Sequence, residues 1–216
     1  MSDAPDNRRI QQVSIFAGSR IGNNPAWESW VSASEELGTL LGQNGYDLAY
    51  GGGDVGYMAA VVKTALAEGS RVKGFIDRFW HEATGSNSPP GVDEVVVESR
   101  EQRKLDMRRE TQASILLPGA IGSMDELFDI YAWQDEQRYR VPSGTPKRPI
   151  IVLNTNGAHD PLKNMIERWI ADGQVYGESV NLIRFVDTPE EVIEILNEYN
   201  KPQPVKAPEF RPNPLS

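Results

Sequence analysis

The sequence predicts an α/β protein with a three-layer, doubly wound, Rossmann-like and mainly parallel sheet of about seven strands. Short apolar segments alternate with amphipathic ones along the chain, which is the pattern of a parallel sheet covered by helices on both faces. At 216 residues, the chain has room for one sizeable α/β domain. We expect this single Rossmann-like domain at 12–200, between a flexible segment at 1–11 and a proline-rich tail at 201–216.

The first half of the chain contains four short apolar runs that predict strands, at Val13–Ala17, Asp47–Tyr50, Val72–Ile76 and Glu94–Val97. Apolar residues recur with helical spacing at Pro25–Gln43 and Val55–Glu68, so helices are predicted there. The stretch Asp77–Gly91 contains glycine and proline and is predicted as a long irregular loop. Loops of this length often form lids or substrate walls, and Trp80 is a candidate for lining a pocket.

The second half continues the same alternation. Ser99 and Gln102 have the spacing of a capping box at the start of a charged helix. Helices are predicted at Ser99–Thr111, Ser123–Gln137, Asp160–Asp172 and Thr188–Tyr199. Strands are predicted at Ala113–Leu117, Ile150–Leu153 and Leu182–Phe185, with a proline-containing connection at Val141–Pro149.

The composition excludes several classes of function. The chain has no cysteine, so disulfides, thiolate metal sites and a cysteine nucleophile are excluded, and His81 and His159 are its only histidines. With 22 basic and 31 acidic residues, the net charge is −9, which disfavours nucleic acid as a partner. No apolar run approaches the roughly 20 residues that span a bilayer, and the polar amino-terminal residues lack the apolar core of a secretion signal. We expect a cytoplasmic protein.

The most informative segment is Leu116–Glu126, where an apolar run stops at Pro118 and two glycines precede a helical pattern. A strand, a glycine turn and a helix amino terminus together form an anion site, because free backbone N–H groups and the helix dipole point at the ligand. A carboxylate one turn into the helix does not suit a phosphate. It therefore serves another part of the same ligand, such as the sugar of a phosphorylated sugar.

Two clusters of charged residues, one acidic and one mainly basic, accompany this segment. Asp125 and Glu126 are consecutive, and consecutive helix positions point about 100° apart, so at most one faces the pocket. Most charges between Arg100 and Arg109 are expected on a salt-bridged helix face. Arg103 is the exception that we favour, because a guanidinium over the pocket mouth would grip a phosphate or a base.

A rival interpretation is a NAD-linked enzyme. The segment Gly51–Gly56 fits GxGxxG between a predicted strand and helix, and Asp77 lies near the spacing of a ribose-binding carboxylate. The motif follows the second predicted strand and not the first, which weakens this interpretation. Glycine turns follow three of the predicted strands, so we expect them to converge at one edge of the sheet.

Four segments in this order resemble the Lonely Guy (LOG) family of cytokinin riboside 5′-monophosphate phosphoribohydrolases, formerly called lysine decarboxylase-like. Phe16–Arg20 matches the family's early Gly-Ser turn, and Tyr50–Met58 its YGGGxxGLM segment. Arg103–Met107 matches its RKxxM helix, and Pro118–Glu126 its PGGxGTxxE signature. The resemblance extends from about residue 13 to residue 196.

The resemblance implies hydrolysis of the N-glycosidic bond of a nucleoside 5′-monophosphate, giving free base and ribose 5-phosphate without a metal or cofactor. By position, Arg103 and Glu126 become the catalytic pair. Substrate and phosphate contacts are implied at Gly18, Ser19, Gly52, Gly53, Met107, Pro118, Gly119, Ala120, Gly122 and Ser123. A carboxylate suits this chemistry, since glycoside cleavage passes through an oxocarbenium-like sugar. The family is commonly dimeric, so a homodimer or larger homo-oligomer is expected, with the site near the subunit interface.

The chain departs from the family pattern at several positions. Ala120 replaces the second glycine of the signature and would be strained if that position required a positive φ, whereas Ser123 keeps the hydroxyl of the usual threonine. These departures bear on which base the protein recognises more than on the reaction. A purine is favoured, with an N6-modified adenine as one candidate, and a pyrimidine is an alternative. A non-catalytic nucleotide or cofactor carrier or sensor of the same fold is the competing class of function.

Overall fold

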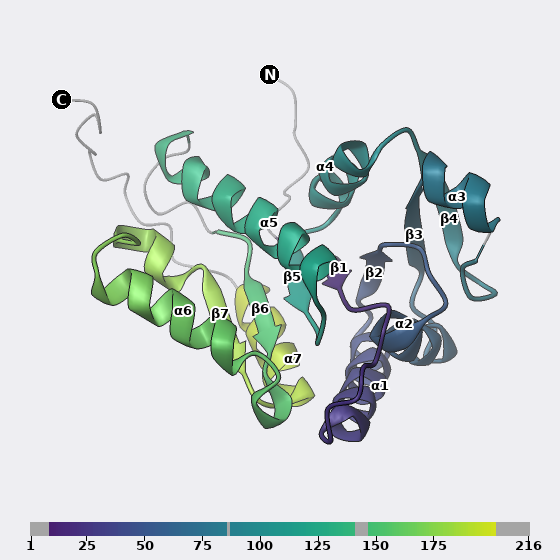
Figure 1. Ribbon diagram of the computed structural model, residues 1–216, viewed down its shortest axis with the longest axis horizontal. Helices are drawn as coiled ribbons and strands as arrows, with labels where there is room; N and C mark the ends of the chain where they lie inside the picture. The colour runs from purple at the N-terminus through teal and green to yellow at the C-terminus, as the bar shows by residue number, and fades with distance from the viewer. Residues whose placement is uncertain (1–8, 86, 141–146, 202–216) are drawn as a thin grey trace.

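A seven-stranded, all-parallel sheet runs through the centre of the computed structural model, which describes residues 9–85, 87–140 and 147–201 (Figure 1). The strands are β1 (Gln12–Phe16), β2 (Asp47–Tyr50), β3 (Val72–Asp77), β4 (Asp93–Val97), β5 (Ala113–Leu116), β6 (Ile150–Leu153) and β7 (Ile183–Val186). Their order across the sheet is β4-β3-β2-β1-β5-β6-β7, so the direction of winding reverses between β1 and β5. In open α/β sheets, ligands bind at such a reversal, beyond the carboxyl ends of the strands.

Helices cover both faces of the sheet and give the three predicted layers. One face carries α1 (Trp27–Gln43), α2 (Gly56–Ala67) and α7 (Pro189–Tyr199), and the other carries α4 (Arg100–Glu110), α5 (Ile121–Arg140) and α6 (Asp160–Ala171). Alternate side chains of a strand enter opposite cores, as Ile15 and Phe16 do in β1. Two short 3₁₀ helices, η1 (Thr155–Gly157) and η2 (Gly177–Asn181), lie in the connections.

Local sequence signals explain several helix ends. The Ser99 hydroxyl accepts a hydrogen bond from the Gln102 N–H and caps α4, as predicted, but the Gln102 side chain bonds to Asp106 and does not complete a capping box. A complete capping box is present at α7, between Thr188 and Glu191. Such caps supply acceptors to backbone N–H groups that have none within the helix.

The irregular loop predicted over Asp77–Gly91 is wrong at its start, because the chain forms α3 (Arg78–Thr84) there. Asp77 caps this helix by accepting a hydrogen bond of 3.0 Å from the Trp80 N–H. Gly85, with a φ of 72°, follows its last residue. Both end signals are present in the sequence, but seven residues are too few to show a helical period.

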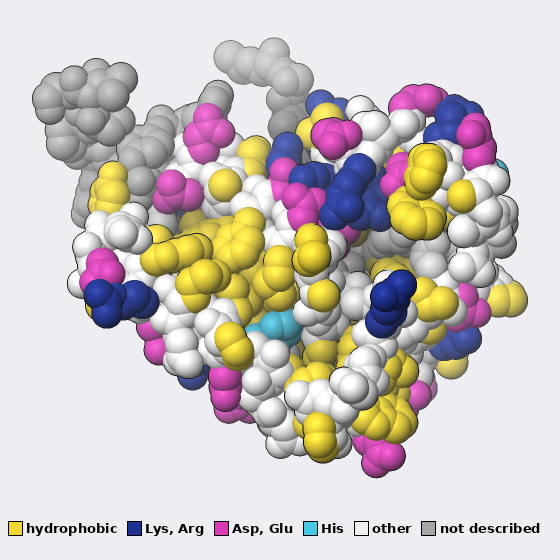
Figure 2. Space-filling view, viewed as in Figure 1, with side chains coloured by type: hydrophobic (Ala, Val, Ile, Leu, Met, Phe, Trp, Pro, Cys, Tyr) yellow, Lys and Arg dark blue, Asp and Glu magenta, His cyan; other side chains and the backbone are white. Residues whose placement is uncertain are grey.

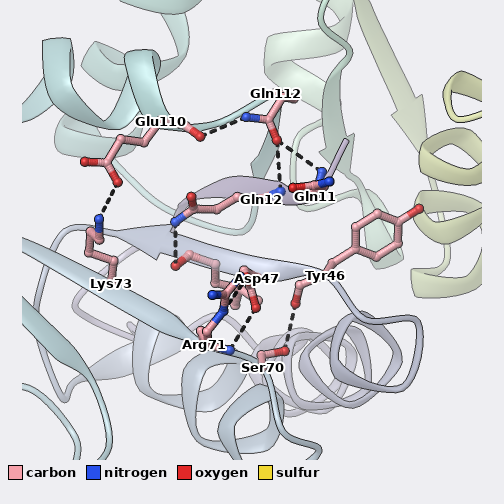
Figure 3. Close-up of polar contacts among 10 residues, drawn as sticks. Gln11, Gln12, Tyr46, Asp47, Ser70, Arg71, Lys73, Glu110 and Gln112 are labelled. Atoms are coloured by element: carbon pink, nitrogen blue, oxygen red, sulfur yellow. Dashed lines mark hydrogen bonds and ion pairs between the residues drawn. The ribbon is translucent and has the colours of Figure 1, made fainter. Parts of the chain in front are cut away.

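Polar contacts close the amino-terminal edge of the sheet, away from the point where ligands are expected (Figure 3). The Gln112 side chain accepts hydrogen bonds from the backbone N–H groups of Gln11 and Gln12, at 3.1 and 3.0 Å. The Lys73 ammonium lies 2.6 Å from the Glu110 carboxylate and joins β3 to the end of α4. These contacts fix β1, β3 and β5 at one end and leave the other end for binding.

The two ends of the described chain meet. Ile10 is buried, and its backbone N–H donates to the Asn200 side chain at 2.7 Å. The predicted flexible segment and tail fall mostly outside the described residues, as do residues 141–146 of the predicted connection. Within the described part of the chain, no helix is both long enough and apolar enough to cross a membrane.

Candidate functional site

The three glycine turns converge at the carboxyl edge of the sheet, as the sequence predicts. Gly18 follows β1, and its N–H donates to the Pro118 carbonyl beyond β5 at 2.9 Å. The Gly18 carbonyl in turn accepts from the N–H of Tyr57, in the first turn of α2, at 3.0 Å. The turns after β1, β2 and β5 are therefore joined through Gly18, at the point where the winding reverses.

Close backbone approach requires glycine at this junction. A β-carbon on Gly18 would lie 3.0 Å from the Gly119 Cα, and one on Gly119 would lie only 2.2 Å from the Ser123 Oγ. Gly56 has a φ of 58°, and a β-carbon there would lie 2.5 Å from the Gly18 carbonyl oxygen. The glycines therefore let three backbone segments pack directly against one another.

The turn from Pro118 into α5 has the geometry of an anion site. Pro118 is buried, whereas Gly119, Ala120 and Gly122 are exposed at the surface. The first N–H groups of α5 have no acceptor within the helix, and the positive end of its dipole lies at the same place. Ser123 is buried in the first turn of α5. An anion seated on this turn would meet backbone donors.

Ala120 is not strained in this turn. Among the described residues, Asn156 is the one non-glycine with a positive φ, so position 120 does not require a glycine conformation. The concern raised by the missing glycine is therefore removed for the free protein.

Glu126 and Arg103 form a buried ion pair beside the turn. The Arg103 Nη2 donates to the Glu126 Oε1 at 2.7 Å, and their side chains are only 14% and 9% exposed. The Arg103 guanidinium also lies against the turn after β2, since a β-carbon on Gly51 would be 3.3 Å from its Nη1. The Arg103 Nε is buried and has no hydrogen-bond partner among the described residues. Arg103 thus joins the turn after β2 to the carboxylate on α5.

The electrostatics of this pair are set by burial. Burial raises the pKa of the Glu126 carboxyl above its ordinary value, and the positive charge of Arg103 opposes that rise. Shifted pKa values are common among the titratable groups of functional sites. Asp125 differs: its carboxylate is 39% exposed and pairs with Arg100 at 3.0 Å and Lys104 at 3.1 Å. Of the two consecutive acids, only Glu126 therefore faces the site.

The remaining charges of α4 form the salt-bridged face that the sequence predicts. Lys104 and Arg108 both contact Asp129 of α5, at 3.5 and 2.8 Å. Figure 2 shows Lys and Arg side chains gathered over α4, with acidic side chains among them, and a hollow in the surface next to this patch. The ion pairs hold α4 and α5 side by side, and these two helices carry Arg103 and Glu126.

The other predicted contact residues lie around this centre. Ser19 is exposed, and Gly52 is buried with a φ of 73°, against Phe75 and Ile76 of β3. Met107 is 2% exposed and lines a small cavity together with Glu126. The Met107 side chain is thus buried and not at the open surface.

The carboxylate and the glycines that favoured NAD binding have other contacts in the structure. Asp77 is buried and accepts the capping hydrogen bond from the Trp80 N–H, so it is not presented to a ribose. Gly51 and Gly52 contact Arg103 and β3. In the part of the chain that the structure describes, no group of three or more potential ligand residues could hold a metal ion.

Sequence reasoning missed a buried histidine next to the start of the turn after β5. The His159 imidazole bonds to the backbone of Leu117, just before Pro118, and is 3% exposed. Burial lowers the pKa of His159 to about 4, so the ring is neutral in the folded protein at neutral pH. His159 thereby supplies a partner to the backbone just beyond β5 and supports the turn from behind. No spacing in the sequence links residue 159 to residue 117.

We expect His159 to make the protein less stable in acid. In the unfolded chain its pKa is near 6.5, whereas in the folded protein it is about 4, so the unfolded state binds more protons between these values. The contribution of the neutral His159 ring to the free energy of unfolding is fully present above pH 6.5. It is lost as the pH falls to 4, at a cost of roughly 3 kcal/mol. Urea unfolding at pH 7 and pH 4 measures it. Between pH 7 and pH 4, the free energy of unfolding of His159→Gln should fall by about that much less than the free energy of unfolding of wild type. An equal fall in both proteins would contradict the assignment.

The fold and the site define a Rossmann-like protein that has a turn with the geometry of an anion site and a buried acid–guanidinium pair. The chain matches the family model described as possible lysine decarboxylase over residues 58–196, well over half of its length. It therefore belongs to this family, which is the LOG family that the four motifs resemble.

Curated relatives extend the match to most of the chain. A probable cytokinin riboside 5′-monophosphate phosphoribohydrolase of Oryza sativa subsp. japonica is 32% identical over 192 residues, covering 89% of this chain and 74% of that protein. A cytokinin riboside 5′-monophosphate phosphoribohydrolase of Arabidopsis thaliana is 29% identical over 194 residues, covering 88% and 84%.

Solved structures support the fold alone. A molybdenum cofactor binding protein from Rippkaea orientalis has a TM-score of 0.62 at 18% identity, covering 88% of this chain and 97% of that one. The molybdenum cofactor carrier protein of Chlamydomonas reinhardtii has a TM-score of 0.60 at 15% identity, covering 88% and 98%.

Proposed function

We propose that this protein hydrolyses the N-glycosidic bond of a purine nucleoside 5′-monophosphate, giving free base and ribose 5-phosphate. N6-modified adenine nucleotides of the cytokinin type are among the candidate substrates. The observation that carries the proposal is the position of the buried Glu126 carboxylate, 2.7 Å from Arg103 and one helical turn into the helix whose amino terminus forms the anion site. The activity named for the family relatives supports the same reaction.

In the proposed complex, the 5′-phosphate lies on the backbone N–H groups at the start of α5, with the Ser123 hydroxyl nearby. The turns at Gly18–Ser19 and Gly52–Gly53 form the neighbouring walls. Glu126 then lies against the ribose, because it is one turn further along the helix that holds the phosphate. In this arrangement the carboxylate contacts the sugar, and the backbone N–H donors contact the anion.

In the proposed reaction, the bond between C1′ and the base nitrogen breaks, and its electron pair leaves with the base. The sugar becomes oxocarbenium-like, and the Glu126 carboxylate stabilises its positive charge and orients water. The water oxygen bonds to C1′ and gives up a proton to Glu126, while the base takes up a proton from solvent. Arg103 holds the carboxylate in place and supplies positive charge next to the leaving base. No metal or cofactor is required.

Product analysis tests the reaction directly. The purified protein is incubated with AMP, N6-isopentenyladenosine 5′-monophosphate, GMP and CMP, and free base and ribose 5-phosphate are measured by chromatography. We expect equal amounts of base and ribose 5-phosphate from at least one purine nucleotide. Release from CMP alone would favour a pyrimidine nucleotide N-glycosidase. Tight binding without release by the folded protein would favour a nucleotide carrier or sensor and would refute the proposed reaction.

We also propose that the protein is a homodimer that pairs through an apolar groove of about 260 Å³ between α5 and the residues after α6. The groove is lined by Phe128, Tyr131, Ala132, Asp135, Trp169, Gln174, Val175 and Tyr176. Figure 2 shows hydrophobic side chains gathered over α5 and α6. An exposed apolar patch of this kind often marks an interface. The groove lies further along the same helix that carries Glu126, so pairing there would bring the partner near the site.

Tyr176→Asp should convert the dimer into a monomer, because Tyr176 is 57% exposed in the groove and the new charge would be buried by pairing. Sedimentation velocity measures the change. Met165→Asp is the matched control, since Met165 is an exposed apolar residue of α6 that does not line the groove, and it should remain dimeric. A monomeric wild type, or a Tyr176→Asp variant that stays dimeric, would contradict this assembly.

A further inference from the structure

We propose that Phe79 and Trp80 of α3 form an aromatic wall that holds the base of the nucleotide and favours purines over pyrimidines. This inference rests on the proposed function, because it assumes that the phosphate lies at the start of α5 and the ribose at Glu126. It concerns a segment that the proposed reaction does not use.

Phe79 and Trp80 are unusual for their exposure. They are 70% and 54% exposed, and their ring centroids lie 5.4 Å apart in an edge-to-face arrangement. Large aromatic side chains usually bury most of their surface, so an adjacent exposed pair indicates a surface that contacts another molecule. Figure 2 shows hydrophobic side chains over α3, next to the basic patch over α4 and the hollow.

The sheet places α3 on the side of the site to which a base would extend. The anion turn lies between β1 and β5, and the strand order continues from β1 to β2 and then to β3. Neighbouring strands are separated by about 4.8 Å, so β3 is about 10 Å from β1. A nucleotide that lies along this edge, with its phosphate at the turn and its ribose at Glu126, carries its base toward β2 and β3.

Contacts connect α3 to the catalytic pair. Arg103 lies against Gly51, and a β-carbon on the next residue, Gly52, would be 3.2 Å from the Ile76 Cβ at the end of β3. Asp77 follows directly and caps α3 through the Trp80 N–H. The wall thus begins a few residues beyond Ile76, which lies against the turn that Arg103 contacts.

A second set of contacts fixes α3 in orientation. Arg78 forms an ion pair and hydrogen bonds with Glu98, which immediately precedes the cap residue of α4. His81 lies 3.6 Å from the Glu94 carboxylate on β4. The helix is therefore tied both to β4 and to the start of the helix that carries Arg103, so its exposed rings are held in place.

The chemistry of two exposed rings fits a planar base. Every base has a planar face that can stack on an aromatic side chain. The larger purine gains more contact from stacking than a pyrimidine does. The wall would also contact an apolar substituent on the base. It would not touch the phosphate or the ribose.

The test compares wild type, the double variant Phe79→Ala/Trp80→Ala and the control Met165→Ala, an exposed apolar residue on α6. Each is measured for KM and kcat with AMP and CMP, and for the Kd of ribose 5-phosphate by calorimetry. For the double variant we expect the KM for AMP to rise by at least about fivefold, with a smaller rise for CMP. The Kd of ribose 5-phosphate should stay within about twofold of wild type, because that ligand has no base. Met165→Ala should match wild type throughout.

An unchanged KM for AMP would overturn the inference, as would an equal weakening of ribose 5-phosphate binding. If wild type releases no base, the proposed reaction fails, and the Kd of AMP then replaces the KM in the same comparison. A rise in that Kd with unchanged ribose 5-phosphate binding would still support the wall. Absence of AMP binding to wild type would overturn both proposals.

Discussion

Glu126→Gln is expected to reduce base release to below detection, a loss of at least about 10²–10³-fold. Glutamine keeps the size of the side chain and can still accept the hydrogen bond from Arg103, but it carries no negative charge. The positive charge that develops on the ribose would then lack its counter-charge, and water would lack its base. Initial rates of base formation, measured by chromatography, give the effect.

The adjacent acid provides the matched control. Asp125→Asn removes the same charge one residue earlier on α5, where the carboxylate is half-exposed and paired with Arg100 and Lys104. We expect its rate to stay within a few-fold of wild type, because Asp125 does not face the site. Thermal unfolding of both variants verifies that they fold. A folded Glu126→Gln protein with near wild-type rates would refute the catalytic role of the carboxylate.

Arg103→Ala should also lower kcat/KM by about 10²–10³-fold and should shift the pH dependence of what remains. The guanidinium is the nearest positive group to Glu126, and it opposes the rise in pKa that burial causes. In wild type, the acid limb of kcat/KM should lie above the ordinary pKa of a glutamate, because Glu126 must be ionised. Removal of Arg103 should move that limb to still higher pH.

Arg109→Ala is the control for loss of an arginine from α4. The Arg109 side chain is 68% exposed and is 4.0 Å from Asp106, so its removal should leave both the rate and the acid limb unchanged. An acid limb that does not move in Arg103→Ala would mean that the titrating group is not Glu126. An unchanged rate would mean that Arg103 is not part of the reaction.

Much of the fold is predictable from the sequence because its signals are local and repeated. Short apolar strands that alternate with amphipathic helices specify a parallel sheet, and glycine turns after strands such as β1 and β5 specify one binding edge. The predicted convergence is confirmed by the hydrogen bond between Gly18 and Pro118. The helix α3 was not predicted because its only sequence signals are the residues at its two ends. Its interior is too short to show a helical period of apolar residues.

Within the site, the sequence could limit the choice between Asp125 and Glu126 but could not make it. Both are acids in the first turns of the same helix, and their difference comes from α4, which pairs Arg100 and Lys104 with Asp125 and presents Arg103 to Glu126. His159 was missed for a related reason. Its partner is a backbone group of a distant strand end, so no motif in the sequence marks the contact.

A crystal structure of Glu126→Gln with bound AMP would test the central claim most directly. The account predicts the phosphate within hydrogen-bonding distance of the backbone N–H groups at the start of α5, with the ribose against residue 126 and next to Arg103. A phosphate bound at another turn, or a ribose directed away from residue 126, would contradict it.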